Sequence, residues 1–278
     1  MQLSIITVAV NNLLFAERFL ASLLEQSAKE FTVFLVISPN IPEKAIEKLL
    51  RDFSGLAITL LRSQDFCLSR SRNLALAHID GDIVAIADDD CAYEPHTVAQ
   101  IIAAFENHNV AGVVMGRAFG FGEEAPSSDD VLTLNLYNIF KNCPSYVQFY
   151  RTSVIKSVGM FDESLGVGSD TPYQSGEETD YALRAIKAGF SVLRVPSIVV
   201  RHPIIALRNK YILDKTICYA AGRMRLLHKH NFPCWFLLAN AFYPLLCLPL
   251  DCLEECFFVI RYRWTMFLAR LKWLIKAK

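Results

Sequence analysis

The chain has 278 residues, 53% of them hydrophobic and 20% charged, with 28 basic and 28 acidic side chains. This composition is too apolar for a disordered chain, and the balanced charge argues against a dedicated nucleic-acid-binding protein. The length suits one large domain, or one domain with an appendage. The charge is unevenly spread, because residues 1–202 carry a net charge of −8 and residues 203–278 a net charge of +8. This asymmetry favours an anionic partner, such as a membrane surface, for the second part.

Strand and helix patterns alternate over the first hundred residues. Apolar, β-rich runs predict strands over Leu3–Val10, Phe31–Ile37, Leu56–Leu61, Ile83–Ala87 and Ala111–Met115. Helical spacing of apolar residues predicts helices over Leu13–Gln26, Pro42–Phe53, Leu68–His78 and Pro95–Glu106. This alternation predicts an α/β fold with a mostly parallel sheet flanked by helices, which binds its ligands beyond the carboxyl ends of the strands.

The next hundred residues predict fewer regular elements. We expect helices over Leu132–Lys141 and Glu177–Ala188, and strands over Val147–Tyr150, Ser191–Val195 and Ile198–Val200. Between them, Gly159–Ser175 forms a loop that is too long for a simple connection, which makes it a candidate binding loop.

The last part of the chain is apolar and basic. Phe232–Leu250 has no charge, but its prolines favour a re-entrant or interfacial segment at least as much as a membrane span. Arg261–Lys278 has basic residues, no acid and an apolar stripe, which predicts an amphipathic helix on an anionic leaflet. A helix docked on the body and a dimer interface are the alternatives. We therefore expect a catalytic domain over residues 1–203 and a helical, membrane-associated region over residues 204–278.

Three adjacent carboxylates, Asp88, Asp89 and Asp90, follow the predicted strand Ile83–Ala87. Side chains alternate in an extended chain, so the first and third point the same way. Neighbouring carboxylates repel unless a cation or hydrogen-bond donors compensate them, and Mg²⁺ or Mn²⁺ with phosphate oxygens in its shell is the usual solution. The alternative is a solvated acidic turn before a helix. At a strand end of an α/β sheet, we favour the metal site.

A second group of acids opens the predicted helix at Glu177. Glu177, Glu178 and Asp180 can stabilise the helix start as a capping box and as charges near the helix dipole. They can equally supply a general base, because the dipole keeps a carboxylate ionised and able to take a proton from a hydroxyl group. The sequence alone leaves these two interpretations equal.

Two basic groups complete the candidates. Arg70 and Arg72 lie near the start of the helix Leu68–His78, where arginines can hold a diphosphate, although either can also be a surface residue. His202 follows the strand Ile198–Val200; a single histidine is usually structural, but at a strand end near Asp88 and Asp90 it can complete a metal shell.

Together, these segments resemble the family-two glycosyltransferases of the GT-A fold, mainly the bacterial enzymes that build cell-surface polysaccharides. The resemblance covers about Leu3 to Pro203. It is carried by SIITVAVNN near the start, SRSRNLALAHIDGDIVAIADDDC (Ser69–Cys91), GMFDESLGVGS (Gly159–Ser169), SGEETDYALRAIKAGF (Ser175–Phe190) and the closing VRHP. The order and spacing of these pieces are specific to the family, whereas each piece alone is weak.

The resemblance implies a nucleotide-sugar donor, most often a UDP-sugar, and a divalent metal, Mn²⁺ or Mg²⁺. Asp88, Asp90 and His202 would hold the metal, and Glu178 would be the catalytic base, with Glu177 beside it and Asp180 supporting it. The family's usual Asp after the second strand is absent, so Asn40 or Asp65 would replace it. Donor and loop contacts would come from Val8, Ala9, Asn11, Asn40, Arg72, Asp88, Asp89, Gly166, Val167 and Gly168.

We therefore expect a metal-dependent, inverting hexosyltransferase that acts on a glycan or lipid-linked acceptor. A sugar nucleotidyltransferase is less well supported, because no Gly-rich phosphate loop follows the first strand, and a dehydrogenase lacks GxGxxG. A degenerate transferase serving as a membrane scaffold is a further alternative. No CxxC pair and no basic leader at Met1–Ser4 are present, so we expect a reducing compartment without a signal peptide, at the cytoplasmic face of the cell membrane.

Overall fold

The computed structural model describes residues 1–126, 128, 130–141, 144–203, 210–251 and 256–276. The chain divides into two compact units. Unit 1 comprises Met1–Phe161 and Glu178–Ile204, and unit 2 comprises Asp162–Glu177 and Ile205–Lys278. The predicted boundary at residue 204 lies outside the described residues.

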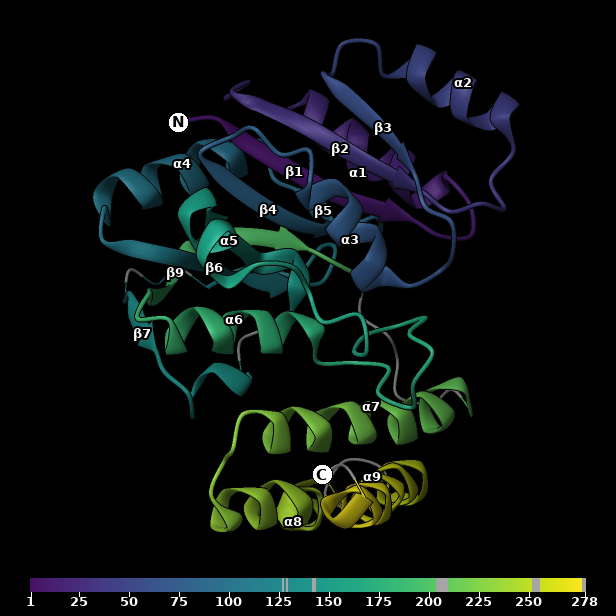
Figure 1. Cartoon of the computed structure of the whole chain (residues 1–278), viewed down its shortest axis with the longest axis vertical. Helices are drawn as coiled ribbons and strands as arrows, with labels where there is room; N and C mark the ends of the chain where they lie inside the picture. Colours follow the sequence, from purple (N-terminus) through teal and green to yellow (C-terminus); the bar gives the residue numbers. More distant parts are fainter. Residues whose placement is uncertain (127, 129, 142–143, 204–209, 252–255, 277–278) are drawn as a thin grey trace. The chain divides into compact units, whose positions relative to one another are not determined.

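Unit 1 is built around one mixed sheet, shown in Figure 1. Its described strands are β1 (Leu3–Ala9), β2 (Phe31–Ile37), β3 (Ile58–Arg62), β4 (Ile83–Asp88), β5 (Ala92–Tyr93), β6 (Ala111–Phe119), β7 (Leu132–Leu134), β8 (Gln148–Arg151) and β9 (Ser191–Arg201). They lie in the order β3-β2-β1-β4-β8-β6-β9-β5, with β7 paired to β9. The first four of this order are parallel, and β8 runs antiparallel to both β4 and β6. The predicted α/β architecture is therefore confirmed.

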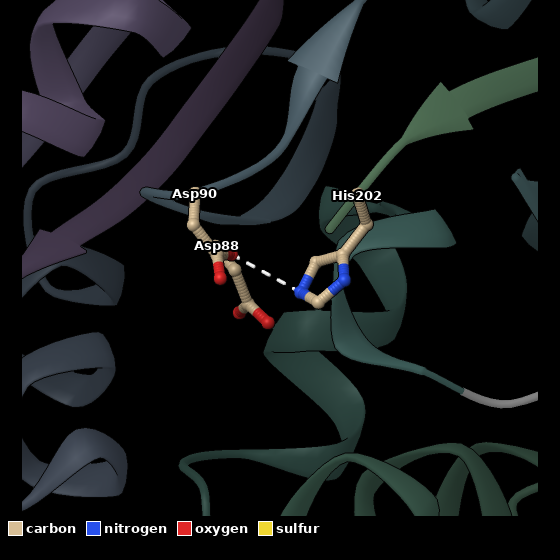
Figure 2. Close-up of side chains that lie close together, drawn as sticks. All are labelled: Asp88, Asp90 and His202. Carbon is tan, nitrogen blue, oxygen red and sulfur yellow. Dashed lines mark ion pairs between the residues drawn. The ribbon is translucent and has the colours of Figure 1, made fainter. Parts of the chain in front are cut away.

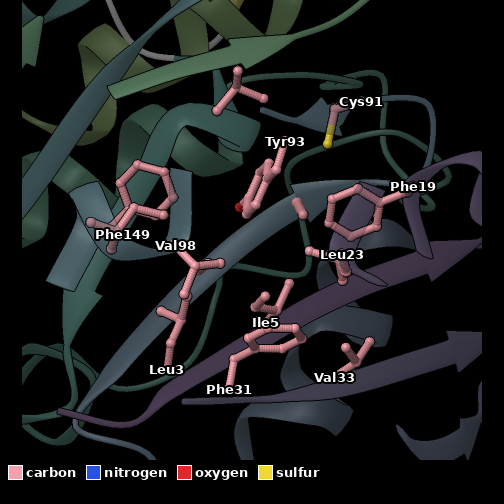
Figure 3. Close-up of a cluster of buried hydrophobic side chains, with 14 of the residues drawn as sticks. Leu3, Ile5, Phe19, Leu23, Phe31, Val33, Cys91, Tyr93, Val98 and Phe149 are labelled. Carbon is pink, nitrogen blue, oxygen red and sulfur yellow. The ribbon is translucent and has the colours of Figure 1, made fainter. Parts of the chain in front are cut away.

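Helices cover this sheet because their apolar residues repeat at helical spacing. They are α1 (Leu14–Leu24), α2 (Glu43–Asp52), α3 (Leu68–Leu76), α4 (Thr97–Asn107), α5 (Thr152–Val158) and α6 (Glu177–Lys187). On α1, Phe19 and Leu23 lie one turn apart and are fully buried against the sheet, as Figure 3 shows beside Ile5 of β1. Burying each such side chain contributes roughly 1.5–3 kcal/mol. This packing holds the parallel strands in place, and with them the polar residues at their carboxyl ends.

The prediction of a helix over Leu132–Lys141 is wrong. Leu132–Leu134 forms β7, which pairs antiparallel with β9, and Ile139–Lys141 forms a single 3₁₀ turn. Apolar and polar residues alternate with a period of two from residue 132 to residue 136, which is the strand pattern, and β9 offers a free edge on that side.

The two predicted strands around Pro196 form one strand, β9. Its register with β6 shifts between Met115 and Arg117, and this bulge accommodates Pro196 within one continuous strand. A side chain at Gly116 would lie 2.8 Å from the carbonyl oxygen of Ile198, so the close approach at this bulge requires glycine.

The described part of unit 2 consists of the loop segment 162–177 and three helices, α7 (Lys210–Lys229), α8 (Cys234–Asp251) and α9 (Cys256–Lys276). The helix predicted over Arg261–Lys278 is present as α9, although its last two residues lie outside the described part. In unit 2, Asp162 forms an ion pair of 2.6 Å with Lys229 of α7, and the Tyr173 and Trp273 rings lie 5.5 Å apart. Among the described residues, no helix combines the length and hydropathy that crossing a bilayer requires.

Candidate functional site

The carboxyl ends of three parallel strands meet at one edge of the sheet. Asp88 is the last residue of β4 and the first partly exposed one after the buried run Ile83–Ala87. It lies beside Val8 of β1 in the sheet register, and the backbone N–H of Ser38 after β2 donates to the carbonyl of Ala9 at 3.0 Å. Three of the predicted donor contacts, Asp88, Val8 and Ala9, therefore lie at the same edge of the sheet.

The remaining predicted donor contacts of this edge follow β1 and β2. Val8 and Ala9 are buried at the end of β1, whereas Asn11 and Asn40 lie just beyond their strands and are exposed. Their side chains are accessible to a ligand at the strand ends.

Asp88, Asp90 and His202 come together at this edge, as Figure 2 shows. One oxygen of each carboxylate and one imidazole nitrogen all lie within 4.8 Å of one another. The Nε2 atom of His202 is 3.1 Å from Oδ1 of Asp90. Asp89 is half-buried and is not a member of this group. His202, which follows β9, is thus brought to Asp88 at the end of β4 and to Asp90 just beyond it, 114 and 112 positions earlier in the chain.

Two contacts orient the ring of His202. It stacks on the ring of Tyr146, with the centroids 4.3 Å apart and the planes 6° apart. Its Nδ1 atom lies 2.9 Å from the carbonyl oxygen of Pro203, which can accept the Nδ1 proton. This arrangement leaves Nε2 as the atom directed at Asp90, and a histidine oriented in this way is well suited to bind a cation through Nε2.

The electrostatics of Asp90 and His202 are those of an ion pair. Burial opposes the charged form of Asp90, but the hydrogen bond and the charge of His202 outweigh it, so the pKa of Asp90 is lowered. Burial likewise disfavours the charged imidazole, yet the contact with Asp90 raises the pKa of His202. The side chain of Arg18 on α1 donates to the backbone carbonyl of Asp90 and holds the turn after β4.

Asp88 is held by two donors. The guanidinium Nη2 of Arg72 and the hydroxyl of Ser145 each donate to Oδ1 of Asp88 at 3.0 Å. Burial raises the pKa of Asp88 in spite of Arg72, and burial together with the neighbouring carboxylates raises the pKa of Asp89 to about 7. Three adjacent carboxylates repel one another, so an added positive charge would stabilise their ionised forms.

Arg72 lies at the centre of a packed cluster rather than on the surface. It is 1% exposed, on α3, and its guanidinium lies 5.7 Å from the centroid of the Phe161 ring. The neighbouring Asn73 side chain accepts from the backbone N–H of Phe161 at 2.7 Å and donates to its carbonyl at 3.0 Å. Phe161 in turn stacks on Tyr181 of α6, at 4.3 Å between centroids. A continuous set of contacts therefore links Asp88 with α6.

The three acids of α6 differ in their surroundings. Asp180 is fully buried and forms an ion pair of 2.9 Å with Arg184, whose guanidinium also donates to the carbonyls of Val158 and Met160. Glu177 is buried as well, whereas Glu178 is half-buried on the first turn. Arg184 thus joins α6 to the end of α5, and Asp180 holds Arg184 in place.

The predicted binding loop is internally ordered. Gly166 has a φ angle of +94°, and a side chain there would lie 2.9 Å from the carboxylate of Glu177. The side-chain amide of Gln174 accepts from the N–H of Gly168 and donates to two carbonyls of the same loop. Val167 is 47% exposed between the two glycines. Glu177 therefore packs beneath the loop to which Gly166, Val167 and Gly168 belong.

Several residues of the site carry no motif in the sequence. Ser145 and Tyr146 belong to a short 3₁₀ turn before β8, and only the insertion of β8 beside β4 brings them to Asp88 and His202. Asp65, considered as a substitute for the missing acid, pairs with Arg70 at 2.6 Å and accepts from the N–H of Cys67, so it orders the loop before α3. A pocket of roughly 320 Å³ adjoins His202, lined by Ala118, Phe119, Gly120, Glu123, Tyr146, His202 and Pro203.

Solved structures share this fold. The mannosyltransferase PcManGT from Pyrobaculum calidifontis, in complex with GDP-Man and Mn²⁺, gives a TM-score of 0.69 at 16% identity, covering 99% of this chain and 86% of that one. TarS 1–349 of S. aureus, in complex with UDP, gives 0.60 at 18% identity, covering 99% and 88%. The match to a second TarS structure has a TM-score of 0.60 at 17% identity. It covers 98% of this chain but 53% of the TarS chain. A comparison with curated proteins gave no match.

The family model that matches the sequence agrees with this fold. Residues 4–155, more than half of the chain, match the model of glycosyl transferase family 2. The match includes β1, Arg72 and the three aspartates, but ends before α6 and His202. The predicted class of enzyme is confirmed, and the chain belongs to glycosyl transferase family 2.

Proposed function

We propose that the protein is a metal-dependent, inverting glycosyltransferase that moves a sugar from a nucleoside diphosphate to a hydroxyl group of a glycan or a lipid-linked acceptor. The observation that carries this proposal is the convergence of Asp88, Asp90 and His202 within 4.8 Å at the carboxyl ends of parallel strands. Ligands of α/β sheets bind at this edge.

The donor atoms of this group fit a divalent ion. Two carboxylate oxygens suit Mg²⁺ and Mn²⁺ alike, and the imidazole nitrogen favours Mn²⁺, because Mg²⁺ prefers oxygen ligands alone. Asp88, Asp90 and His202 would hold the ion. When bound there, it would supply the positive charge that stabilises a diphosphate leaving group. The Mn²⁺ of PcManGT, a protein of the same fold, supports this choice of metal.

Arg72 acts in this proposal as a positioning residue. Its buried guanidinium holds Oδ1 of Asp88 in place and adds a permanent positive charge next to the acids. The hydroxyl of Ser145 donates a second hydrogen bond to the same oxygen. With Oδ1 held by these two donors, the orientation of the Asp88 carboxylate is set before a ligand arrives.

Glu178 is the proposed general base. It lies one turn before Tyr181 on α6, and the two therefore share a side of the helix. Tyr181 stacks on Phe161, and the Phe161 ring lies against Arg72, which holds Asp88. These contacts support placing Glu178 on the side of α6 that is turned toward the strand ends, where an acceptor hydroxyl would lose its proton during attack on the anomeric carbon.

The donor is proposed to be a nucleoside diphosphate sugar. UDP and GDP-Man are bound by the structural neighbours, so UDP-sugars and GDP-sugars are the first donors to examine. Asn11 and Asn40 are the exposed polar side chains after β1 and β2, and they are proposed to contact the base or ribose in place of the carboxylate that the family usually has.

The test is donor turnover by the purified chain. UDP- and GDP-sugars are incubated with the protein and Mn²⁺, and nucleoside diphosphate release is measured with and without EDTA. The proposal expects release from one donor class, lost in EDTA and restored by Mn²⁺. Undiminished release in EDTA would remove the metal from the proposal. The stereochemistry of the product, measured by NMR, tests inversion separately.

A further inference from the structure

Helices α8 and α9 of unit 2 each expose a stripe of large apolar side chains. The stripe of α8 recurs at three- and four-residue spacing, so its members share one face of the helix: Trp235, Leu238, Phe242 and Leu246. The stripe of α9 follows the same spacing: Ile260, Trp264, Leu268, Leu271 and Ile275. A helix that meets only water carries polar side chains at such positions.

The two stripes join into one surface, the apolar face. The ring of Phe267 lies 5.3 Å from that of Phe242 on α8 and 5.6 Å from that of Trp264 on α9, measured between centroids. Single exposed apolar residues are ordinary on proteins, but a contiguous set marks a surface that is covered in use. Leu246 and Ile275 are 71% and 74% exposed, which makes this set costly to leave in water.

The charges that flank the α9 stripe are basic. Arg261 and Lys272 flank the α9 stripe on one side and Arg263 flanks it on the other, as helical geometry places them. The sequence from residue 256 to residue 276 contains no acid. Trp235 and Trp264 are the residue type that gathers at membrane–water interfaces, where part of the ring is apolar and part is polar.

We propose that the apolar face docks in the plane of an anionic lipid leaflet, with the basic residues at its rim against the head groups. A face of apolar and aromatic side chains with a basic rim is the pattern of an interfacial helix. A second copy of this chain is the other occupant of matching shape. A symmetric contact between two copies would bring like-charged rims together, which disfavours it.

Vesicle binding by the full chain tests this proposal. The protein is sedimented with vesicles of phosphatidylcholine alone and of phosphatidylcholine with phosphatidylglycerol, at low and high salt. We expect binding to the anionic vesicles that weakens as salt rises, because head-group attraction is screened. No binding to anionic vesicles, or equal binding to both kinds, would overturn the proposal.

A matched pair of variants locates the contact. Leu246→Glu places a charge in the apolar face, and Val110→Glu makes the same kind of change at a position of unit 1 that is 80% exposed. Leu246 would be buried in the leaflet, so its replacement should lower vesicle affinity by about 10-fold or more. The Val110 variant should bind as the wild type does. Equal effects would overturn the assignment of the face. Light scattering tests a second copy as the alternative occupant. A dimer that Leu246→Glu dissociates, without vesicle binding, would show that a second copy, and not lipid, covers the apolar face.

Tryptophan quenching provides a readout that does not depend on affinity. Brominated lipids in the vesicles should quench Trp235 and Trp264 of the apolar face, but not Trp273, whose ring packs against Tyr173 within unit 2. The variant Trp235→Phe/Trp264→Phe, which keeps only Trp273, should therefore retain its emission on the same vesicles. Strong quenching of that variant would contradict the proposed orientation.

Discussion

At the end of β4, Asp88 and Asp90 converge with an imidazole nitrogen and remain partly exposed. In the acid-rich stretch from Asp162 to Asp180, two carboxylates instead have separate partners within the protein: Asp162 pairs with Lys229, and Asp180 with Arg184. Both regions are dense in acids in the sequence. The difference shows that a high density of acids in the sequence does not by itself indicate a metal site, which also requires carboxylate oxygens that converge on one point.

The largest expected effect is at the converging acids. Asp90→Asn removes the negative charge and weakens the contact with His202, so we expect sugar transfer and Mn²⁺ binding to be lost while the fold is retained. Transfer assays and calorimetric titration with Mn²⁺ measure the two losses, and circular dichroism checks the fold. The control is Glu106→Gln, an exposed acid on α4, which should leave both unchanged. Normal Mn²⁺ affinity in the Asp90 variant would contradict the comparison.

The next effect concerns Glu178. Glu178→Gln keeps the size and polarity of the side chain but cannot accept the proton, so we expect the transfer rate to fall by about 10²–10⁴. Donor affinity should be unchanged, and measuring it by titration with the nucleotide separates binding from chemistry. Glu177→Gln is the matched neighbour, buried beneath Gly166, and should lower the rate far less. A wild-type rate in the Glu178 variant would move the base to another acid.

Most of the fold is predictable from local pattern. The strands β1, β2 and β4 are continuous apolar runs, as strands buried on both faces must be, and α1 repeats its buried residues at helical spacing. β5 has two residues and no pattern of its own, because its pairing with β9 alone defines it. The predicted helix at β7 is wrong, because an alternating run this short does not identify a strand without the edge of β9 beside it.

The site is predictable where chemistry follows a strand end. Asp88 ends the buried strand β4, Asp90 lies two residues beyond it, and His202 directly follows β9, so the sequence alone indicates all three. Ser145, Tyr146 and Phe161 were not identified, because their positions depend on the strand order β4-β8-β6-β9 and on side-chain packing against α3. Neither is written in a local pattern. The burial of Asp180 is not predictable for the same reason, since the contacts of its partner Arg184 with the end of α5 are tertiary.

A smaller effect is expected at Asp180, and on stability rather than catalysis. Asp180→Asn leaves the buried end of Arg184 without its charged partner, so we expect the free energy of unfolding to fall by about 1.5–3 kcal/mol. Urea denaturation measures this, and the rate per folded molecule should remain near that of the wild type. Asp52→Asn breaks an exposed pair with Lys48 at the same spacing and should cost less than about 1 kcal/mol. A catalytic loss without a stability loss would place Asp180 with the converging acids.

The smallest effect is expected at Asp162, which pairs with Lys229 in the acid-rich stretch. Burial alone would raise the pKa of Asp162, but the hydrogen bonds from Lys229 and Ser164 outweigh it and lower that pKa. A lowered carboxyl pKa stabilises the folded state at every pH above the ordinary value, and this stabilisation is lost as the pH falls through the lowered one. Asp162→Asn should therefore reduce the free energy of unfolding by up to about 1 kcal/mol at neutral pH, and by less at about pH 3. Hydrogen exchange of residues 162–177 at the two pH values measures the difference. If the gap between variant and wild type widened on acidification, the Lys229 pair would not be what holds this loop.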